Sequence, residues 1–190
     1  VYVSPICSVP TALVAAMVEA RGRWRRAELV TDYLVEPLTA FDHPGEPFHL
    51  TSLQPSPAVN TMRDAGALRT VPASYSQFFS MLRPGGPHAI DVALLQVSTP
   101  GPEGRFSLGV AAGTNIELLR TVPTIIAEVN PQMPYTFGVA EIERDEVDVL
   151  VDVDHPLVEL RVPEPDELAR TIGRLAAAEI PDGSVLQFGI

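Results

Sequence analysis

The chain has 190 residues, of which 46% are hydrophobic and 19% are charged, a composition typical of a globular domain and unlike that of a disordered one. Its 24 acidic residues against 13 basic residues give a formal net charge of −11, so the chain has no general attraction for nucleic acids or anionic lipids. All of the basic residues are arginines, which excludes lysine chemistry such as Schiff-base formation within this chain.

The first 18 residues and the single cysteine, Cys7, bear on the cellular compartment. One cysteine can form neither an internal disulfide nor a cysteine-rich metal site, a usage typical of the reducing cytoplasm. The uncharged run over 1–18 approaches the length of a membrane span, but Pro5 and Pro10 interrupt it. We therefore predict a cytoplasmic protein that does not contact the membrane.

Residues 1–82 alternate between short apolar runs and segments of helical periodicity. Ser8 and Gly66 stand where a helix would be capped and terminated, respectively. The predicted elements are a strand over 1–6, a helix over 11–18, a strand over 27–35, a surface loop over 37–47, a short helix over 57–65, a short strand over 69–73 and a helix over 74–82.

The alternation continues over 90–190. The run 90–97 is almost continuously apolar, which is typical of a buried parallel strand in the centre of a sheet. The pattern as a whole predicts an α/β domain with a mainly parallel sheet and helices on both faces. The other predicted elements are a helix over 115–121, a buried strand over 124–129, a strand over 147–154 near an edge, a helix that starts after Asp166, and a last strand over 184–188.

Few side chains suggest chemistry from their type and spacing. Cys7 precedes a helix, where a thiol can become nucleophilic, but a free cysteine is commonly a small buried apolar residue, and we predict that structural role. The histidines are scattered without metal-ligand spacing and are interpreted as surface or loop residues, while the aspartates of 147–154 fit a solvated strand face better than a metal site. These residues are His43, His49, His88 and His155, and Asp148, Asp152 and Asp154.

Two loops follow apolar strands and are the candidate binding segments. Asn130 and Gln132 follow the strand over 124–129, and Gly189 and Ile190 follow the last one. Ligands of open α/β sheets gather at the carboxyl ends of strands, where amides can orient a carbonyl group and glycine lets backbone donors approach an oxyanion. We predict that these four residues line a substrate cleft, with turn formation by Asn130 and Gln132 as the alternative.

Three segments together resemble the acetyl-CoA hydrolase/transferase family, which includes 4-hydroxybutyrate and succinyl-CoA:acetate CoA-transferases. They are Ile90–Ser98, Gly104–Gly109 and Ile126–Pro134, and shorter similarities extend over nearly the whole chain. The resemblance implies a CoA-transferase-like (Rossmann-like) domain over 1–190, which would be the N-terminal part of a two-domain protein. The chain lacks an initial methionine and stops inside a predicted strand, which also predicts a fragment.

The resemblance implies a ping-pong reaction in which a glutamate attacks an acyl-CoA thioester, forms an acyl-glutamyl anhydride, and passes CoA to a second acid or to water. In the family this glutamate belongs to the C-terminal domain, and none of Glu128, Glu141, Glu143 and Glu179 matches it. We therefore assign no catalytic residue and expect this chain by itself to be inactive. Coenzyme A is then a substrate, and neither a permanently bound cofactor nor a metal is expected. The expected partners are an acyl-CoA, a small carboxylate, the missing C-terminal domain or a partner subunit, and further copies of the protein in a homo-oligomer.

Asn60, Gln77 and Phe137 stand where the family often has an arginine, a glutamate and a histidine, respectively. These departures keep two alternatives open: a non-catalytic module that binds acyl-CoA or another metabolite, and one subunit of a split two-chain transferase. Proteins that share a fold can have different functions.

Overall fold

The computed structural model describes residues 1–38, 47–113 and 115–187. The chain divides into two compact units, Val1–Leu160 and Arg161–Ile190, which we describe separately. A single domain over 1–190 stays a prediction. No helix among the described residues is long and apolar enough to cross a membrane.

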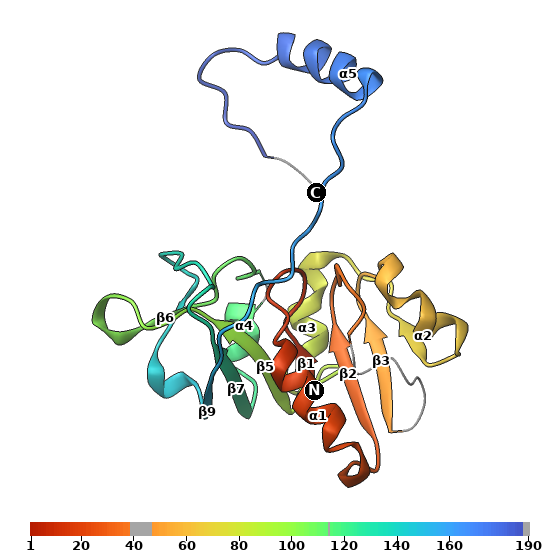
Figure 1. The fold of residues 1–190 in the computed structure, drawn as a ribbon, viewed down its shortest axis with the longest axis vertical. Helices are drawn as coiled ribbons and strands as arrows, with labels where there is room; N and C mark the ends of the chain where they lie inside the picture. The colour runs from red at the N-terminus through yellow and green to blue at the C-terminus, as the bar shows by residue number, and fades with distance from the viewer. Residues whose placement is uncertain (39–46, 114, 188–190) are drawn as a thin grey trace. The chain divides into compact units, whose positions relative to one another are not determined.

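The described part of the first unit is built on a seven-stranded parallel sheet with the order β4-β3-β2-β1-β5-β7-β9 (Figure 1). The chain adds β2, β3 and β4 on one side of β1, and β5, β7 and β9 on the other. The direction of winding therefore reverses between β1 and β5, and a doubly wound sheet opens a crevice at the carboxyl ends of such strands. The strands are β1 Tyr2–Val3, β2 Ala27–Thr31, β3 Phe48–Ser52, β4 Leu68–Thr70, β5 Val92–Val97, β7 Thr124–Val129 and β9 Val149–Asp152.

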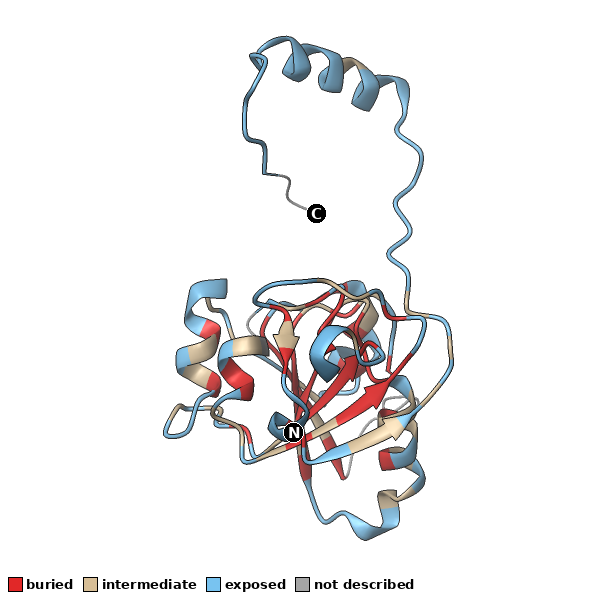
Figure 2. Cartoon of the chain, turned by 90° about the vertical axis from the view of Figure 1, so that its left-hand side faces the viewer, coloured by how far each residue is buried: buried red, intermediate tan, exposed pale blue. Residues whose placement is uncertain are grey.

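Helices cover both faces of this sheet. Because side chains alternate along a strand, Val3 and Leu94 belong to one core cluster while Tyr2 and Leu95 belong to the other. The first cluster includes residues of α1 and α2, and the second includes residues of α3 and α4. Figure 2 shows that buried residues concentrate in the strands of the sheet. The helices are α1 Thr11–Glu19, α2 Asn60–Asp64, α3 Phe78–Leu82 and α4 Asn115–Leu119, with 3-10 turns η1 Arg21–Arg23, η3 Pro57–Val59, η4 Tyr75–Gln77, η5 Pro102–Gly104 and η6 Arg144–Glu146.

The predicted fold class is confirmed, and the predictions locate the central strands β5 and β7 best. The strand β7 coincides with its prediction, β5 is paired on both sides, and β9 lies at an edge of the sheet as expected. A strand that is buried on both faces of a sheet is apolar at almost every position, so a short stretch of sequence is enough to predict it.

Three strands have no counterpart among the predictions. The strand β3 contains His49 and Thr51, which lie on a polar part of the sheet and weaken its apolar pattern. The antiparallel pair β6 Phe106–Ser107 and β8 Glu141–Ile142 has two residues in each strand. Such short segments carry no periodicity, and their pairing depends on the tertiary structure.

Several local predictions are wrong. Ser8 does not cap α1: Pro10 is the N-cap residue, and the Ser8 hydroxyl donates to the Gln96 carbonyl oxygen at 3.4 Å. The predicted surface loop over 37–47 is described only at three residues: Pro37 is exposed, whereas Leu38 and Pro47 are buried, and 39–46 lie outside the described residues. Residues 184–187 form no strand, because a strand needs a partner for its backbone groups, and no described residue pairs with them. Phe188 lies outside the described residues.

The second unit contains the helix α5, Glu167–Ala178. Asp166 caps it as the sequence predicts, by accepting a hydrogen bond from the Ala169 N–H at 2.7 Å. The apolar residues Leu168, Ile172 and Leu175 are spaced to lie on one face, and all three are exposed.

Candidate functional site

A network of polar side chains lies at the carboxyl ends of β5 and β7. At its centre is Glu128, a fully buried carboxylate in β7. Its Oε1 atom accepts a hydrogen bond from the Leu13 N–H at 2.6 Å, and its Oε2 atom lies 3.0 Å from His155 Nε2. Burial raises the pKa of Glu128, and the hydrogen bonds with Leu13 and His155 offset this effect only in part. Glu128 thereby ties the start of α1 to the sheet.

His155 joins the segment after β9 to the same network. Its Nδ1 atom donates to the Pro156 carbonyl oxygen at 3.1 Å, since a carbonyl can only accept. Burial by itself would lower the pKa of His155, but the hydrogen bonds to Pro156 and Glu128 outweigh it, and the pKa is raised. The protonated ring can donate from both nitrogens, which makes the contact with Glu128 an ion pair.

The structure brings Asn130 and Gln132 to this edge of the sheet, in different environments. Asn130 is fully buried, and its amide donates to Gln96 Oε1 at 3.0 Å and to the His155 carbonyl oxygen at 2.8 Å. Gln132 is exposed and donates to Asp154 Oδ1 at 2.7 Å. Asn130 therefore holds the loop in place, whereas Gln132 is accessible to a ligand. The predicted residues Gly189 and Ile190 lie outside the described residues, and substrate binding by all four stays a prediction.

A cavity of about 670 Å³ is lined by residues of η4, α3, α4 and β8 and of the loops beside them. This volume falls in the range typical of small-molecule sites. Its lining combines apolar side chains with a few charged ones, and includes Tyr75, Phe79, Ile116, Arg120, Val139 and Glu141.

Glu141 is the best-organised polar group of this cavity. It accepts hydrogen bonds from the Tyr135 hydroxyl at 2.5 Å, from the Gly138 N–H at 3.1 Å, and from two nitrogens of Arg105 at 3.3 Å. The Tyr135 hydrogen bond, supported by Gly138 and Arg105, holds the pKa of Glu141 below its usual value. Glu141 is thus a fixed carboxylate in the cavity wall. The sequence does not predict this arrangement around Glu141, because Arg105 lies 36 positions earlier in the chain.

The departures from the family pattern have different structural settings. The Gln77 side chain accepts hydrogen bonds from the Ser74 N–H at 2.9 Å and the Ser74 hydroxyl at 3.0 Å, so it caps the turn η4. Phe137 is 73% exposed, and its ring centroid lies 5.0 Å from that of Tyr135. Asn60 is the first residue of α2.

The other residues that the sequence singled out, Cys7 and the histidines, lie in different environments. Cys7 is a free, half-buried thiol. His49 lies in the strand β3 instead of a loop and is half-buried. His155 lies in a loop but contributes to the buried network. His43 lies outside the described residues. Within the described ranges, no group of three or more His, Cys, Asp or Glu side chains could hold a metal ion.

Comparisons with known proteins agree with the fold. A family model for the acetyl-CoA hydrolase/transferase N-terminal domain matches residues 29–159. The 4-hydroxybutyrate coenzyme A transferase of Clostridium kluyveri is 40% identical over 101 residues, which cover 53% of this chain and 24% of that protein. The butyryl-CoA:acetate CoA-transferase of Anaerostipes caccae is 26% identical over 189 residues, which cover 96% of this chain and 42% of that protein. The crystal structure of RipA from Yersinia pestis matches with a TM-score of 0.88 at 25% identity, covering 100% of this chain and 47% of that chain. The chain therefore spans less than half the length of these relatives.

Proposed function

Because the chain belongs to the acetyl-CoA hydrolase/transferase family, we propose that it is the N-terminal part of an enzyme that transfers CoA from an acyl-CoA to a carboxylate or to water. The observation that carries this proposal is the match to the family's N-terminal domain over 29–159, together with relatives that are named as CoA-transferases. The protein is a cytoplasmic homo-oligomer that uses CoA as a substrate and holds no permanent cofactor.

In the proposed reaction, a glutamate outside residues 1–190 supplies the nucleophile. Its carboxylate oxygen attacks the thioester carbonyl, the CoA thiolate leaves, and an acyl-glutamyl anhydride forms. The thiolate then attacks the glutamyl carbonyl and releases the acyl group as a free acid, which leaves CoA on the enzyme. A second carboxylate, or water, removes CoA from the glutamate in the last step.

This chain contributes one wall of the cleft. Tyr75, Phe79 and Ile116 offer an apolar surface for the acyl group, in a cavity of about 670 Å³. Gln132 orients the thioester carbonyl or the acceptor carboxylate without adding a charge that would perturb the attacking glutamate. Gly189 and Ile190, which lie outside the described residues, stay the candidates for backbone N–H donors to the oxyanion.

The test is to incubate the complete protein with an acyl-CoA and reduce it with borohydride, which converts an enzyme-CoA thioester to an alcohol. We expect substrate-dependent inactivation and a mass change on one glutamate outside residues 1–190. Modification of a residue inside 1–190 would contradict the assignment of the nucleophile. Tight acyl-CoA binding without modification or turnover would favour a non-catalytic binding module.

A further inference from the structure

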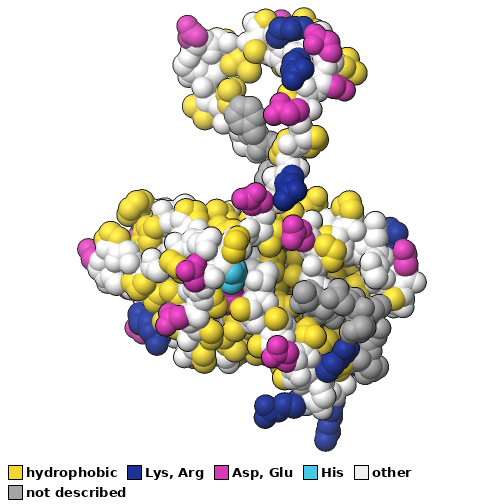
Figure 3. Space-filling model, viewed as in Figure 1, with side chains coloured by type: hydrophobic (Ala, Val, Ile, Leu, Met, Phe, Trp, Pro, Cys, Tyr) yellow, Lys and Arg dark blue, Asp and Glu magenta, His cyan; other side chains and the backbone are white. Residues whose placement is uncertain are grey.

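The segment that leads into β2 is rich in arginine, although the chain as a whole is acidic. Four of the 13 basic residues lie within 21–26, in a chain with a net charge of −11. They are Arg21, Arg23, Arg25 and Arg26, and the last three are exposed. Figure 3 shows arginine side chains gathered at the lower end of the view, below α1. This end of the molecule therefore carries a local positive field that can attract anions.

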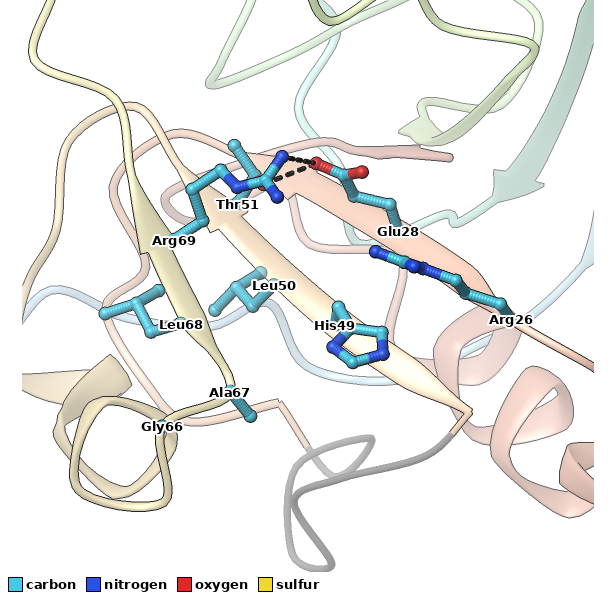
Figure 4. A pocket seen from close by; sticks show the side chains of 9 residues that line it. All are labelled: Arg26, Glu28, His49, Leu50, Thr51, Gly66, Ala67, Leu68 and Arg69. Atoms are coloured by element: carbon cyan, nitrogen blue, oxygen red, sulfur yellow. Dashed lines mark hydrogen bonds and ion pairs between the residues drawn. The ribbon is translucent and has the colours of Figure 1, made fainter.

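A cavity of about 170 Å³ lies beside this segment, over the outer strands β2, β3 and β4. The parallel register pairs Glu28 with His49, and Thr51 with Arg69, which brings all four side chains to one face of the sheet. Figure 4 shows Arg26 reaching inward from the start of β2 and Arg69 from β4, with His49 between them. A single water molecule needs only about 10–15 Å³ of such volume, so the cavity can hold a small ion together with water.

Glu28 holds one side of the cavity in place. Its Oε1 atom accepts a hydrogen bond from the Thr51 hydroxyl at 2.6 Å and lies 3.5 Å from Arg69 Nη1 and 4.0 Å from His88 Nδ1. The Thr51 hydrogen bond, with the charges of Arg69, His88 and Arg26, lowers the pKa of Glu28 against the opposing effect of burial. An ionised Glu28 therefore orients Arg69.

The two arginines keep donors that Glu28 does not use. A guanidinium group has five N–H donors, and Arg69 directs one nitrogen to Glu28. Arg26 makes no hydrogen bond or ion pair within the described part of the chain. Glu28 is the one carboxylate among the described residues that line the cavity, so two guanidinium charges face a single negative charge within that set.

We propose that this arginine pocket, formed by Arg26, His49 and Arg69 around Glu28, binds a phosphoryl group. A phosphate presents several oxygens and up to two negative charges, and it can accept bidentate hydrogen bonds from guanidinium groups on opposite sides. The His49 ring lines the same cavity. The pocket lies toward the amino ends of β2 and β3, away from the carboxyl ends where CoA transfer is proposed, and it does not depend on that proposal.

The test is calorimetric titration of the complete protein with inorganic phosphate at constant ionic strength. We expect saturable binding to one site, and no displacement of phosphate by an equal concentration of acetate. The phosphoryl group could belong to a free phosphate ion or to a phosphorylated metabolite, and a parallel titration with adenosine monophosphate distinguishes the two. Tighter binding than phosphate indicates a phosphorylated metabolite, and weaker binding indicates the free ion. The absence of saturable heat with both ligands would overturn the proposal.

Substitutions test whether the heat of phosphate binding comes from this pocket. Arg69→Gln and Arg26→Gln should each weaken phosphate binding about tenfold or more, the loss typical of one charge-assisted hydrogen bond. Glu28→Gln should strengthen binding, because it removes the negative charge that repels the ligand. The matched control is Arg63→Gln, because Arg63 is 61% exposed, pairs with Asp64 and does not line the cavity. Circular dichroism checks the fold of each variant. If one of the two arginine variants does not fold, the phosphate affinity of the other tests the assignment. Equal affinities in the arginine variants and the control, or weaker binding in Glu28→Gln, would contradict the assignment.

Discussion

At the scale of single residues, the pairing of His155 with Glu128 predicts a pH dependence of stability. The pKa of His155 is raised in the folded state, so its contribution is fully present below the ordinary histidine pKa of about 6.5 and is lost as the pH rises through the higher folded value. The free energy of unfolding of the complete protein should therefore fall as the pH rises above about 6.5. Urea denaturation across this range measures it, and His155→Gln should flatten the slope. An unchanged slope in the variant would show that other groups titrate.

Asp32 predicts an effect in a lower pH range. It is 5% exposed, burial raises its pKa from 3.8 to about 6 against a hydrogen bond from the Tyr33 backbone, and its Oδ1 atom has no hydrogen-bond partner among the described residues. Stability from this group is present at low pH and is lost as the pH rises through about 6. Asp32→Asn should therefore raise the free energy of unfolding at pH 8 by on the order of 1–3 kcal/mol.

The same substitution should have a much smaller effect at pH 4, where the folded carboxyl is already neutral. Denaturation of the wild type and the variant at both pH values gives the comparison. Equal effects at the two pH values would indicate a change in packing instead of a change in charge.

Gln132 is the predicted substrate-binding residue that the structure leaves accessible. Gln132→Ala in the complete enzyme should lower kcat/KM by roughly 10- to 1,000-fold, about 1.4 to 4 kcal/mol, and leave the melting temperature nearly unchanged. The control is Asp154→Ala, which removes the hydrogen-bond partner of Gln132 but keeps its amide. If both variants lose the same activity, or if Gln132→Ala unfolds, the role of Gln132 is to hold the loop.

At the scale of elements, α5 has an apolar face that the described chain leaves exposed. Leu168, Ile172 and Leu175 are 68%, 58% and 67% exposed, respectively. The relatives are more than twice as long as this chain, so we predict that other parts of the complete protein cover this face. Ile172→Ser should then destabilise the complete protein by about 1.5–3 kcal/mol.

The same change should have little effect on the chain 1–190, and thermal denaturation of the two proteins measures the difference. Arg170→Gln is the matched control, because Arg170 lies on the opposite side of the helix and is exposed. Similar losses in the short chain and the complete protein would mean that the face is covered within residues 1–190.

At the scale of the whole molecule, we predict that residues 1–190 by themselves do not catalyse CoA transfer or thioester hydrolysis. A covalent mechanism cannot proceed without its nucleophile, and the proposed glutamate lies outside this chain. The assay measures CoA release and transfer with several short acyl-CoAs. Turnover that exceeds the uncatalysed background and survives further purification would require a nucleophile within 1–190, and Cys7 would be the first residue to replace.

The sequence by itself determined the α/β class, the family and the strands with almost continuous apolar runs, but not the buried strand β3. Segments such as 92–97 and 124–129 are apolar over a length that suits a buried strand, and this signal is local because burial acts on each side chain in turn. The family resemblance also rests on contiguous segments around these strands. Short elements such as β6 and β8 lack that signal and were missed.

Only the tertiary structure decided which polar groups meet. Glu128 binds the backbone of Leu13 across 115 positions, Arg105 reaches Glu141 across 36, and Arg69 reaches Glu28 across 41. Hydrophobic periodicity records which face of an element is buried, but it does not specify which elements are neighbours or in what register they pair. Hydrogen bonds and ion pairs require contact to within a few ångströms, so the polar network, the Glu141 site and the arginine pocket exist only once the sheet order and register are fixed.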